Sequence, residues 1–267
     1  MTVSSPASPG NSLSPHRQIL GLPFFLGSVD EAVDRMERGG LLVVPAAPAL
    51  KNLARDAEYR EALLAADLIL PDSAFMVTIW NRMQGDRIRR LSGLKYLSAL
   101  LERPSMRAPH ASFWIMAGQE SARRNRNWLR EQGVEIADED FYVAPVYGRP
   151  VDDEVLLARI RRQRPKHIVV TVGGGTQERL GLYLRRRLDY PASIHCIGAA
   201  IAFLSGDQVR IPEWADRFYA GWLLRCASNP GRYLPRYWEA RKLLPLMLRY
   251  GSRLPDMARE LTPEKIG

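Results

Sequence analysis

The stretch DLILPDS, residues 67–73, has the pattern of a buried strand that ends in an acid. Its apolar run Leu68–Leu70 stops at a Pro-Asp-Ser sequence, and a helical pattern over residues 74–83 follows directly. Open α/β sheets bind ligands beyond the carboxyl ends of their strands, so the pattern predicts that Asp72 lies at a ligand site. A carboxylate in that place can act as a general base, or it can cap the next helix.

Apolar runs alternate with amphipathic stretches along most of the chain. The runs predict strands at 41–45, 68–70, 111–116, 134–137, 167–172 and 193–198. The amphipathic stretches predict helices at 49–65, 74–83, 94–101, 151–163 and 177–188, and another that ends near 132. Strands that are apolar throughout and separated by helices are typical of a parallel sheet covered on both faces. The expected fold class is therefore α/β, a doubly wound, Rossmann-like and mostly parallel sheet with a C-terminal helical appendage.

Composition divides the chain into three parts. Residues 1–17 are rich in Ser and Pro and lack an apolar segment, which predicts a disordered tail rather than a secretory signal. Residues 18–208 form the expected α/β domain, and residues 209–267 the appendage, with a boundary near 207–211 where the alternation stops. No run approaches the roughly 18 apolar residues of a membrane-spanning helix, so the protein is expected in the cytoplasm, in solution or on a membrane face.

The 267 residues carry a formal net charge of +9, which favours anionic partners such as nucleic acid, phosphorylated small molecules or an anionic membrane. Cys196 and Cys226 form neither a disulfide framework nor a zinc pattern, and the four histidines are scattered. These features argue against a structural metal site and against histidine-based nucleophilic catalysis. No nucleic-acid reading module is visible, so nucleic acid is not an expected partner.

Glycines follow several of the predicted strands at the edge where ligands should bind. The run Gly173-Gly174-Gly175-Thr176 opens a helix, and its backbone N–H groups could cradle a phosphate, or the run could be a tight turn. Gln177 and Glu178 follow on the first helical turn, as site residues or as ordinary caps. Gly118 and Gly198 end two other strands at the same edge and are further candidates for substrate contact.

The acidic run Asp138-Glu139-Asp140 imitates the DxD motif of metal-dependent glycosyltransferases. Carboxylates that flank one position can hold a divalent cation bound to a nucleotide diphosphate. Short acidic runs are more often solvated turns, which is the interpretation favoured here.

The C-terminal part combines aromatic and basic residues. Trp214, Phe218 and Trp222 recur every four residues, which places them on one face of a helix. Arg217 and Arg225 belong to the same stretch, and a second helical stretch carries Arg232 among further arginines and tyrosines. Such a helix suits a membrane interface, where arginines can also grip a diphosphate, or it packs its stripe against the sheet.

Taken together, these blocks resemble the WecG/TagA/CpsF family, also called glycosyltransferase family 26. The resemblance covers residues 20–237, and its most specific block is DAEYREALLAADLILPDS, which is similar to the family's D-x-x-L-R-x-A-L-x-x-A-D-L-x-x-P-D-G. RRLSGLKYLSALL resembles R-x-x-G-x-D-L, and GGGTQERL resembles G-x-P-K-Q-E-x-W. The opening ILGLPFFLGSVDEAVDRM and the closing stretch from GAAIAFLSG to GRYLPRY look like the family's first hairpin and helix and its last block.

The resemblance implies an inverting transfer of a sugar from a UDP-sugar to a polyprenyl-diphosphate-linked sugar, on the cytoplasmic face of the cell membrane, without metal or other cofactor. The products would feed a surface polysaccharide or an exopolysaccharide. By position it assigns the catalytic base to Asp72, with Ser73 beside it in the site. It further assigns substrate contacts to Gln177, Glu178 and the arginines 217, 225 and 232. A homo-oligomer is compatible with these features.

Several polar positions of the family differ in this chain. The family's T-x-N before its first helix is Pro45-Ala46-Ala47 here, and two family aspartates are Lys95 and Ala202. The Gly after the catalytic Asp is Ser73, and the Pro-Lys before Gln-Glu is Gly175-Thr176. These departures leave open a different hexose donor and a non-catalytic nucleotide-sugar-binding relative. A metal-dependent transferase that uses Asp138 and Asp140 is the third alternative.

Overall fold

A computed structural model describes residues 16–206 and 230–258. Its centre is a sheet of eight strands in the order β1-β2-β4-β3-β8-β7-β5-β6. Only the β1–β2 hairpin is antiparallel, and every other neighbouring pair is parallel. The strands are β1 His16–Ile19, β2 Leu22–Phe25, β3 Gly40–Val43, β4 Leu68–Ile69, β5 Ser112–Met116, β6 Phe141–Val143, β7 His167–Val170 and β8 Ser193–Cys196. The predicted doubly wound, mostly parallel α/β fold is confirmed.

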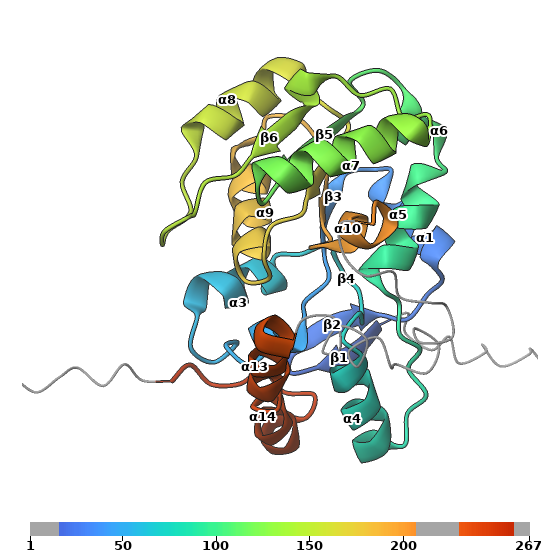
Figure 1. Cartoon of the computed structure of the whole chain (residues 1–267). Helices are drawn as coiled ribbons and strands as arrows, with labels where there is room; N and C mark the ends of the chain where they lie inside the picture. Colours follow the sequence, from blue (N-terminus) through green and yellow to red (C-terminus); the bar gives the residue numbers. More distant parts are fainter. Residues whose placement is uncertain (1–15, 207–229, 259–267) are drawn as a thin grey trace, which may run out of the picture.

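Helices cover both faces of the sheet (Figure 1). One face carries α2 Ala47–Leu50, α3 Ala57–Leu64, α4 Ala74–Gln84, α8 Glu154–Gln163, α9 Thr176–Arg187, α13 Pro230–Ala240 and α14 Leu243–Tyr250. The other carries α1 Val29–Met36, α5 Gly93–Leu101, α6 Pro104–Arg107, α7 Gln119–Glu131 and α10 Ala200–Leu204. Side chains of one strand alternate between the two cores, as Leu41 and Leu42 on β3 do, because successive residues of a strand point to opposite faces.

Two local predictions were wrong. The strand expected at 134–137 is absent. The strand that pairs with β5 is β6, which begins only after the short 3₁₀ turn Asp138–Asp140. Val134 and Ile136 are buried all the same, in the core under α7, so their apolar character reflects packing rather than pairing. The helix expected at 49–65 is divided into α2 and α3, because the Asp56 carboxylate accepts the Tyr59 N–H and starts a new helix there.

The C-terminal helices α13 and α14 are built into the main core. Leu243 and Met247 are fully buried in the same cluster as α2 and α4. The segment after α14 also closes the first hairpin, since the Leu20 and Gly21 N–H groups donate to the carbonyls of Gly251 and Ser252 at 2.8 and 2.9 Å. The predicted boundary at 207–211 and the Trp214/Phe218/Trp222 stripe lie outside the described residues.

None of the helices in the described parts of the chain is long and apolar enough to cross a bilayer.

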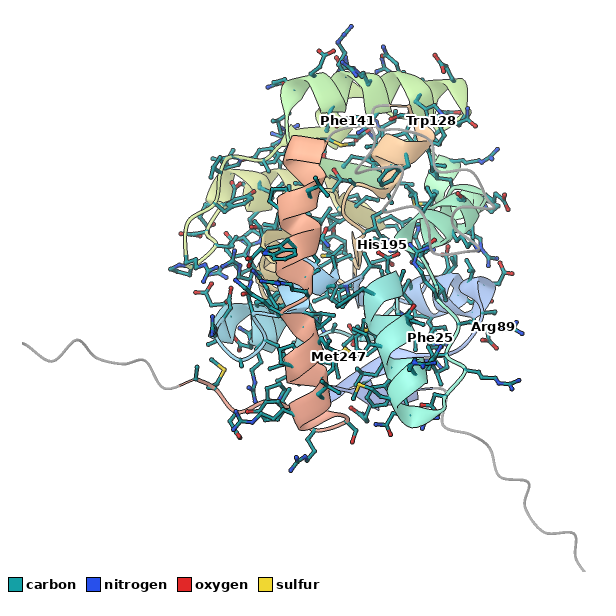
Figure 2. All side chains as sticks on the ribbon, turned by 60° about the horizontal axis from the view of Figure 1, so that its bottom comes forward. Phe25, Arg89, Trp128, Phe141, His195 and Met247 are labelled. Carbon is teal, nitrogen blue, oxygen red and sulfur yellow. The ribbon has the colours of Figure 1, made fainter. Side chains whose placement is uncertain are left out.

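Buried polar side chains form a chain of hydrogen bonds beneath α5. Tyr96 Oη lies 2.9 Å from His195 Nδ1, and His195 Nε2 lies 3.1 Å from His167 Nδ1. His167 Nε2 contacts Ser105 Oγ at 3.1 Å, and Ser105 donates to the carboxylate of Glu37. Figure 2 marks His195 near the middle of the molecule. This chain therefore joins β7 and β8 to α5, α6 and the end of α1.

Burial of the two histidines predicts a loss of stability in mild acid. It lowers the pKa of His167 to about 4 and that of His195 well below its usual value. The unfolded chain has histidine pKa values near about 6.5, so below that pH it binds more protons than the native state. The free energy of unfolding should therefore fall as pH drops from 6.5 to 5, by up to about 1.4 kcal/mol per pH unit for each histidine.

Chemical denaturation at several pH values measures this slope, and the window lies above the range in which most carboxylates titrate. His167→Gln should lower stability at neutral pH and flatten the slope. A free energy of unfolding that is constant or rising toward pH 5 in the wild type would contradict the prediction.

Candidate active site

Asp72 stands at the carboxyl end of β4, where the strand gives way to α4. Its side chain is 26% exposed, and its Oδ1 lies 2.9 Å from Arg90 Nη2 and 3.3 Å from the Gly93 N–H. Arg90 also binds the Asp72 carbonyl through Nε. Gly93 is the first residue of α5, so the carboxylate satisfies one of the N–H groups that a helix start leaves unpaired. Asp72 is thus partly accessible, and one of its oxygens is held by two donors.

Ser73, rather than Asp72, caps α4. Ser73 Oγ accepts the Met76 N–H at 3.2 Å, and only 8% of the residue is exposed. The capping interpretation of Asp72 is therefore wrong for the helix that follows it. The hydroxyl of Ser73 is already used by the helix, and its predicted contact with substrate stays a prediction.

The triple-glycine turn lines a cavity of about 330 Å³ at the end of β7. Gly175 has φ +91°, which a side chain would strain, and α9 begins at the next residue, Thr176. A Cβ on Gly173 would meet nothing within 4 Å, so the turn presents bare backbone to the cavity. The remaining lining comes from α2, the segment between α2 and α3, α3, the loop before α8, and α9: Pro48, Ala49, Asn52, Asp56, Tyr59, Arg149 and Arg179.

Glu178 supports this turn from inside the protein. It is fully buried, its Oε2 accepts the Gly175 N–H at 2.6 Å, and burial raises its pKa. Its Oε1 accepts from Gln177 Nε2 at 3.1 Å. The capping interpretation of Glu178 is therefore confirmed, and a direct contact with substrate remains a prediction.

Gln177 is oriented differently from Glu178. It is 2% exposed, and its Oε1 has no hydrogen-bond partner among the described residues. A Cβ on Gly198, which follows β8 and has φ +61°, would stand 3.6 Å from that oxygen. Gln177 thus lies between the ends of β7 and β8.

The two predicted centres occupy one edge of the sheet but not one pocket. β3 and β8 separate β4 from β7, which at about 4.8 Å per strand spaces the ends of these two strands by roughly 14 Å. Pro45 and Ala47, which stand where the family has polar residues, are buried behind β3, and Ala202 is buried in α10. Lys95 is exposed on α5.

The acidic run at 138–140 lies at the amino end of β6, the opposite edge of the sheet from Asp72. Asp138 pairs with Arg126 and Arg130 at 2.9 and 2.8 Å. The buried Asp140 contacts His110 and the Ala137 N–H. These carboxylates therefore cannot serve a ligand that reacts at Asp72, and the described residues contain no cluster of three metal-ligating side chains.

The structure describes only part of four other predicted substrate contacts. Arg217 and Arg225 lie outside the described residues. Arg232 belongs to α13, and its side chain is also outside the description. Gly118 precedes α7 in an extended conformation, φ −172°.

Sequence reasoning missed Arg90, the main partner of Asp72. The signal was present in RRLSGLK, since Arg90 and Gly93 are the Arg and Gly of the R-x-x-G pattern. It also missed Arg179, which is 8% exposed, binds the Gly175 carbonyl through Nε and lies near Asp56. Nothing local distinguishes Arg179 from the many other arginines of the chain.

Comparison with known proteins finds sequence relatives among glycosyltransferases. The chain is 26% identical over 209 residues to the N-acetylglucosaminyldiphosphoundecaprenol N-acetyl-beta-D-mannosaminyltransferase of Bacillus spizizenii, covering 75% of this chain and 78% of that enzyme. The model of the family described as Glycosyl transferase WecG/TagA/CpsF matches residues 17–256. A match over that much of the chain shows that the chain belongs to the WecG/TagA/CpsF family of glycosyltransferases.

Proposed function

We propose that this glycosyltransferase moves a sugar from a UDP-sugar to a polyprenyl-diphosphate-linked glycan, with inversion at the anomeric carbon. The observation that carries the proposal is the Asp72 carboxylate, partly exposed at the carboxyl end of β4 and held by Arg90 and the Gly93 N–H. The Bacillus spizizenii relative is named for transfer to N-acetylglucosaminyldiphosphoundecaprenol, which supports a lipid-diphosphate acceptor.

The reaction is a direct displacement. Asp72 accepts the proton of an acceptor hydroxyl while that oxygen attacks the anomeric carbon and the bond to UDP breaks. Since Arg90 and Gly93 hold one carboxylate oxygen, the other is left to face the acceptor. The leaving diphosphate takes up negative charge, which the amino terminus of α9 and nearby arginines stabilise.

The distance along the sheet edge suits a donor of this size. A UDP-sugar is an elongated ligand, and the strand that leads to the glycine-turn cavity lies three strand spacings, roughly 14 Å, from the strand that leads to Asp72. We assign the nucleotide to the cavity side and the reacting sugar to the Asp72 side. The family's polar residues are replaced at Pro45, Ala47 and Ala202, which favours a donor sugar that makes fewer hydrogen bonds than the N-acetylmannosamine for which the Bacillus spizizenii relative is named.

The acceptor would reach the site from the inner face of the cell membrane. We assign the contact with that membrane face to α13 and α14. Figure 2 shows α14 beside α4, whose start follows Asp72 directly, and α13 packs against α2. Their outer surface exposes Leu234, Trp238, Leu244 and Leu248, and the Arg241 guanidinium stacks 3.5 Å from the centre of the Trp238 ring. Aromatic rings beside arginines suit the headgroup layer of an anionic bilayer. The pathway served would be that of a surface polysaccharide or an exopolysaccharide.

A transfer assay tests the proposal. Purified protein is incubated with a panel of radiolabelled UDP-sugars and a short-chain polyprenyl-diphosphate N-acetylglucosamine, and the lipid product is counted. We expect transfer from one donor, unchanged by EDTA, because the acidic run lies at the wrong edge of the sheet. Binding of a UDP-sugar by calorimetry without transfer to any lipid acceptor would contradict the proposal, and loss of transfer in EDTA would contradict its metal-free chemistry.

A further inference from the structure

The buried hydrogen-bond chain beneath α5 has one consistent direction. The Glu37 carboxylate can only accept, so the single hydroxyl hydrogen of Ser105 is used there and Ser105 Oγ must accept from His167 Nε2–H. His167 Nδ1 then carries no hydrogen and accepts from His195 Nε2–H. His195 Nδ1 likewise carries no hydrogen and accepts from the Tyr96 hydroxyl.

Both histidines must be neutral for this order to hold. Each has two ring nitrogens, one of which donates while the other accepts, and a protonated ring would present two donors. Burial lowers the pKa of His167 and of His195, which agrees with neutral rings. At the surface end, Lys166 pairs with Glu37 and keeps the final acceptor in place.

The other end of the chain lies one helical turn from the site. Tyr96 and Gly93 are three residues apart on α5 and therefore share a face of the helix. Gly93 packs closely there, since a Cβ on it would stand 3.4 Å from both the Ile197 carbonyl oxygen and Val44 Cγ2. The position of α5 thus decides where the Gly93 N–H points, and that N–H holds Asp72.

We infer that Tyr96, His195, His167 and Ser105 act together as positioning residues for Asp72. By tying α5 to β7, β8, α6 and the end of α1, they keep the Gly93 N–H aimed at the carboxylate, so that its other oxygen faces the acceptor. The inference rests on the proposed role of Asp72 as the base. None of the four touches substrate in this arrangement.

A purely structural role for the same residues gives a different expectation. Buried polar groups need partners, and any one deletion would then lower stability independently of the others. Tyr96 and Ser105 share no hydrogen bond and stand at opposite ends of the chain with two histidines between them, so non-additive losses in the double variant indicate that the four residues act as one unit. Coupling in turnover therefore separates the two roles.

The test compares Tyr96→Phe, Ser105→Ala and the double variant. Tyr190→Phe is the matched control, because it removes a Tyr hydroxyl bond to the Pro165 carbonyl at the opposite edge of the sheet. We expect Tyr96→Phe to lower kcat about 3- to 10-fold, the worth of one hydrogen bond, with the donor KM within about twofold. The double variant should lose no more than the worse single variant. Ser105 is only partly buried, so Ser105→Ala keeps the test informative if Tyr96→Phe folds poorly.

Amide hydrogen exchange at Gly93, followed by NMR, gives a second readout that needs no activity. Exchange should be faster in both single variants and unchanged in Tyr190→Phe. Wild-type kcat in Tyr96→Phe, losses that multiply in the double variant, or unchanged Gly93 exchange would each overturn the inference. Full activity in Asp72→Asn would instead overturn the proposed function, and Gly93 exchange would still report on the positioning.

Discussion

Asp72→Asn should fold normally and lose at least about 100-fold in turnover, since general-base catalysis contributes about 10²- to 10⁴-fold. The amide has nearly the shape of the carboxylate, and its oxygen can still accept from Arg90 and the Gly93 N–H. What it cannot do is take the proton of the attacking hydroxyl. The Arg90 and Asp72 side chains are 15% and 26% exposed, and the hydrogen bonds that the amide oxygen retains preserve the packing of this partly buried pair.

The experiment measures initial rates in the lipid-acceptor assay together with thermal unfolding. Asp86→Asn is the matched control, since Asp86 is 21% exposed and also pairs with an arginine, Arg17, at 2.9 Å. Asp86 follows the carboxyl end of α4, whereas Asp72 precedes its amino end. The control should keep full turnover. Activity of Asp72→Asn within about twofold of the wild type would remove Asp72 from the chemistry.

The triple variant Trp238→Ala, Leu244→Ala, Leu248→Ala should bind anionic vesicles about 100-fold more weakly. Each of these side chains is at least 39% exposed, and each would contribute about 1 kcal/mol on entering the headgroup layer, which together is about a 100-fold change. Sedimentation with vesicles of defined anionic lipid content measures the partitioning. Transfer to a long-chain lipid acceptor should fall in parallel, while transfer to a water-soluble short-chain acceptor is retained.

The matched control replaces exposed apolar side chains on other helices, Leu64→Ala and Val155→Ala, which should leave vesicle binding unchanged. Surface substitutions are preferable to truncation near residue 211. Such a truncation would also remove Leu243 and Met247 from the main core and the backbone bonds from Leu20 and Gly21. Undiminished vesicle binding by the triple variant would place the membrane contact elsewhere.

Local patterns predicted most of the fold correctly. The runs at 68–70, 111–116, 167–172 and 193–198 contain strands. A short segment that is apolar throughout buries both of its faces when it lies in a parallel sheet covered by helices on each side. The run at 134–137 failed for a specific reason. Val134 and Ile136 are equally buried, but under α7 and without a strand neighbour, and burial alone does not distinguish these cases.

The partners of Asp72 could not be predicted in the same way. Arg90 and Gly93 are 18 and 21 residues away in sequence, and the Tyr96–His195 contact spans 99 residues. The four histidines looked scattered in the sequence, yet two of them meet because β7 and β8 are neighbours in the sheet. The assignment of a cap to Asp72 or to Ser73 also depended on backbone geometry, since both residue types cap helices well.

By itself the sequence determined the alternation of strands and helices, the family, and the placement of Asp72 at the end of a strand. These follow from side-chain periodicity and from the order of motifs, which are properties of short segments. Only the tertiary structure decided which groups hold Asp72, that the glycine turn lies three strands away, and that α13 and α14 complete the core. Those contacts depend on the strand order β4-β3-β8-β7, and strand order is set by the packing of the whole sheet rather than by any one segment.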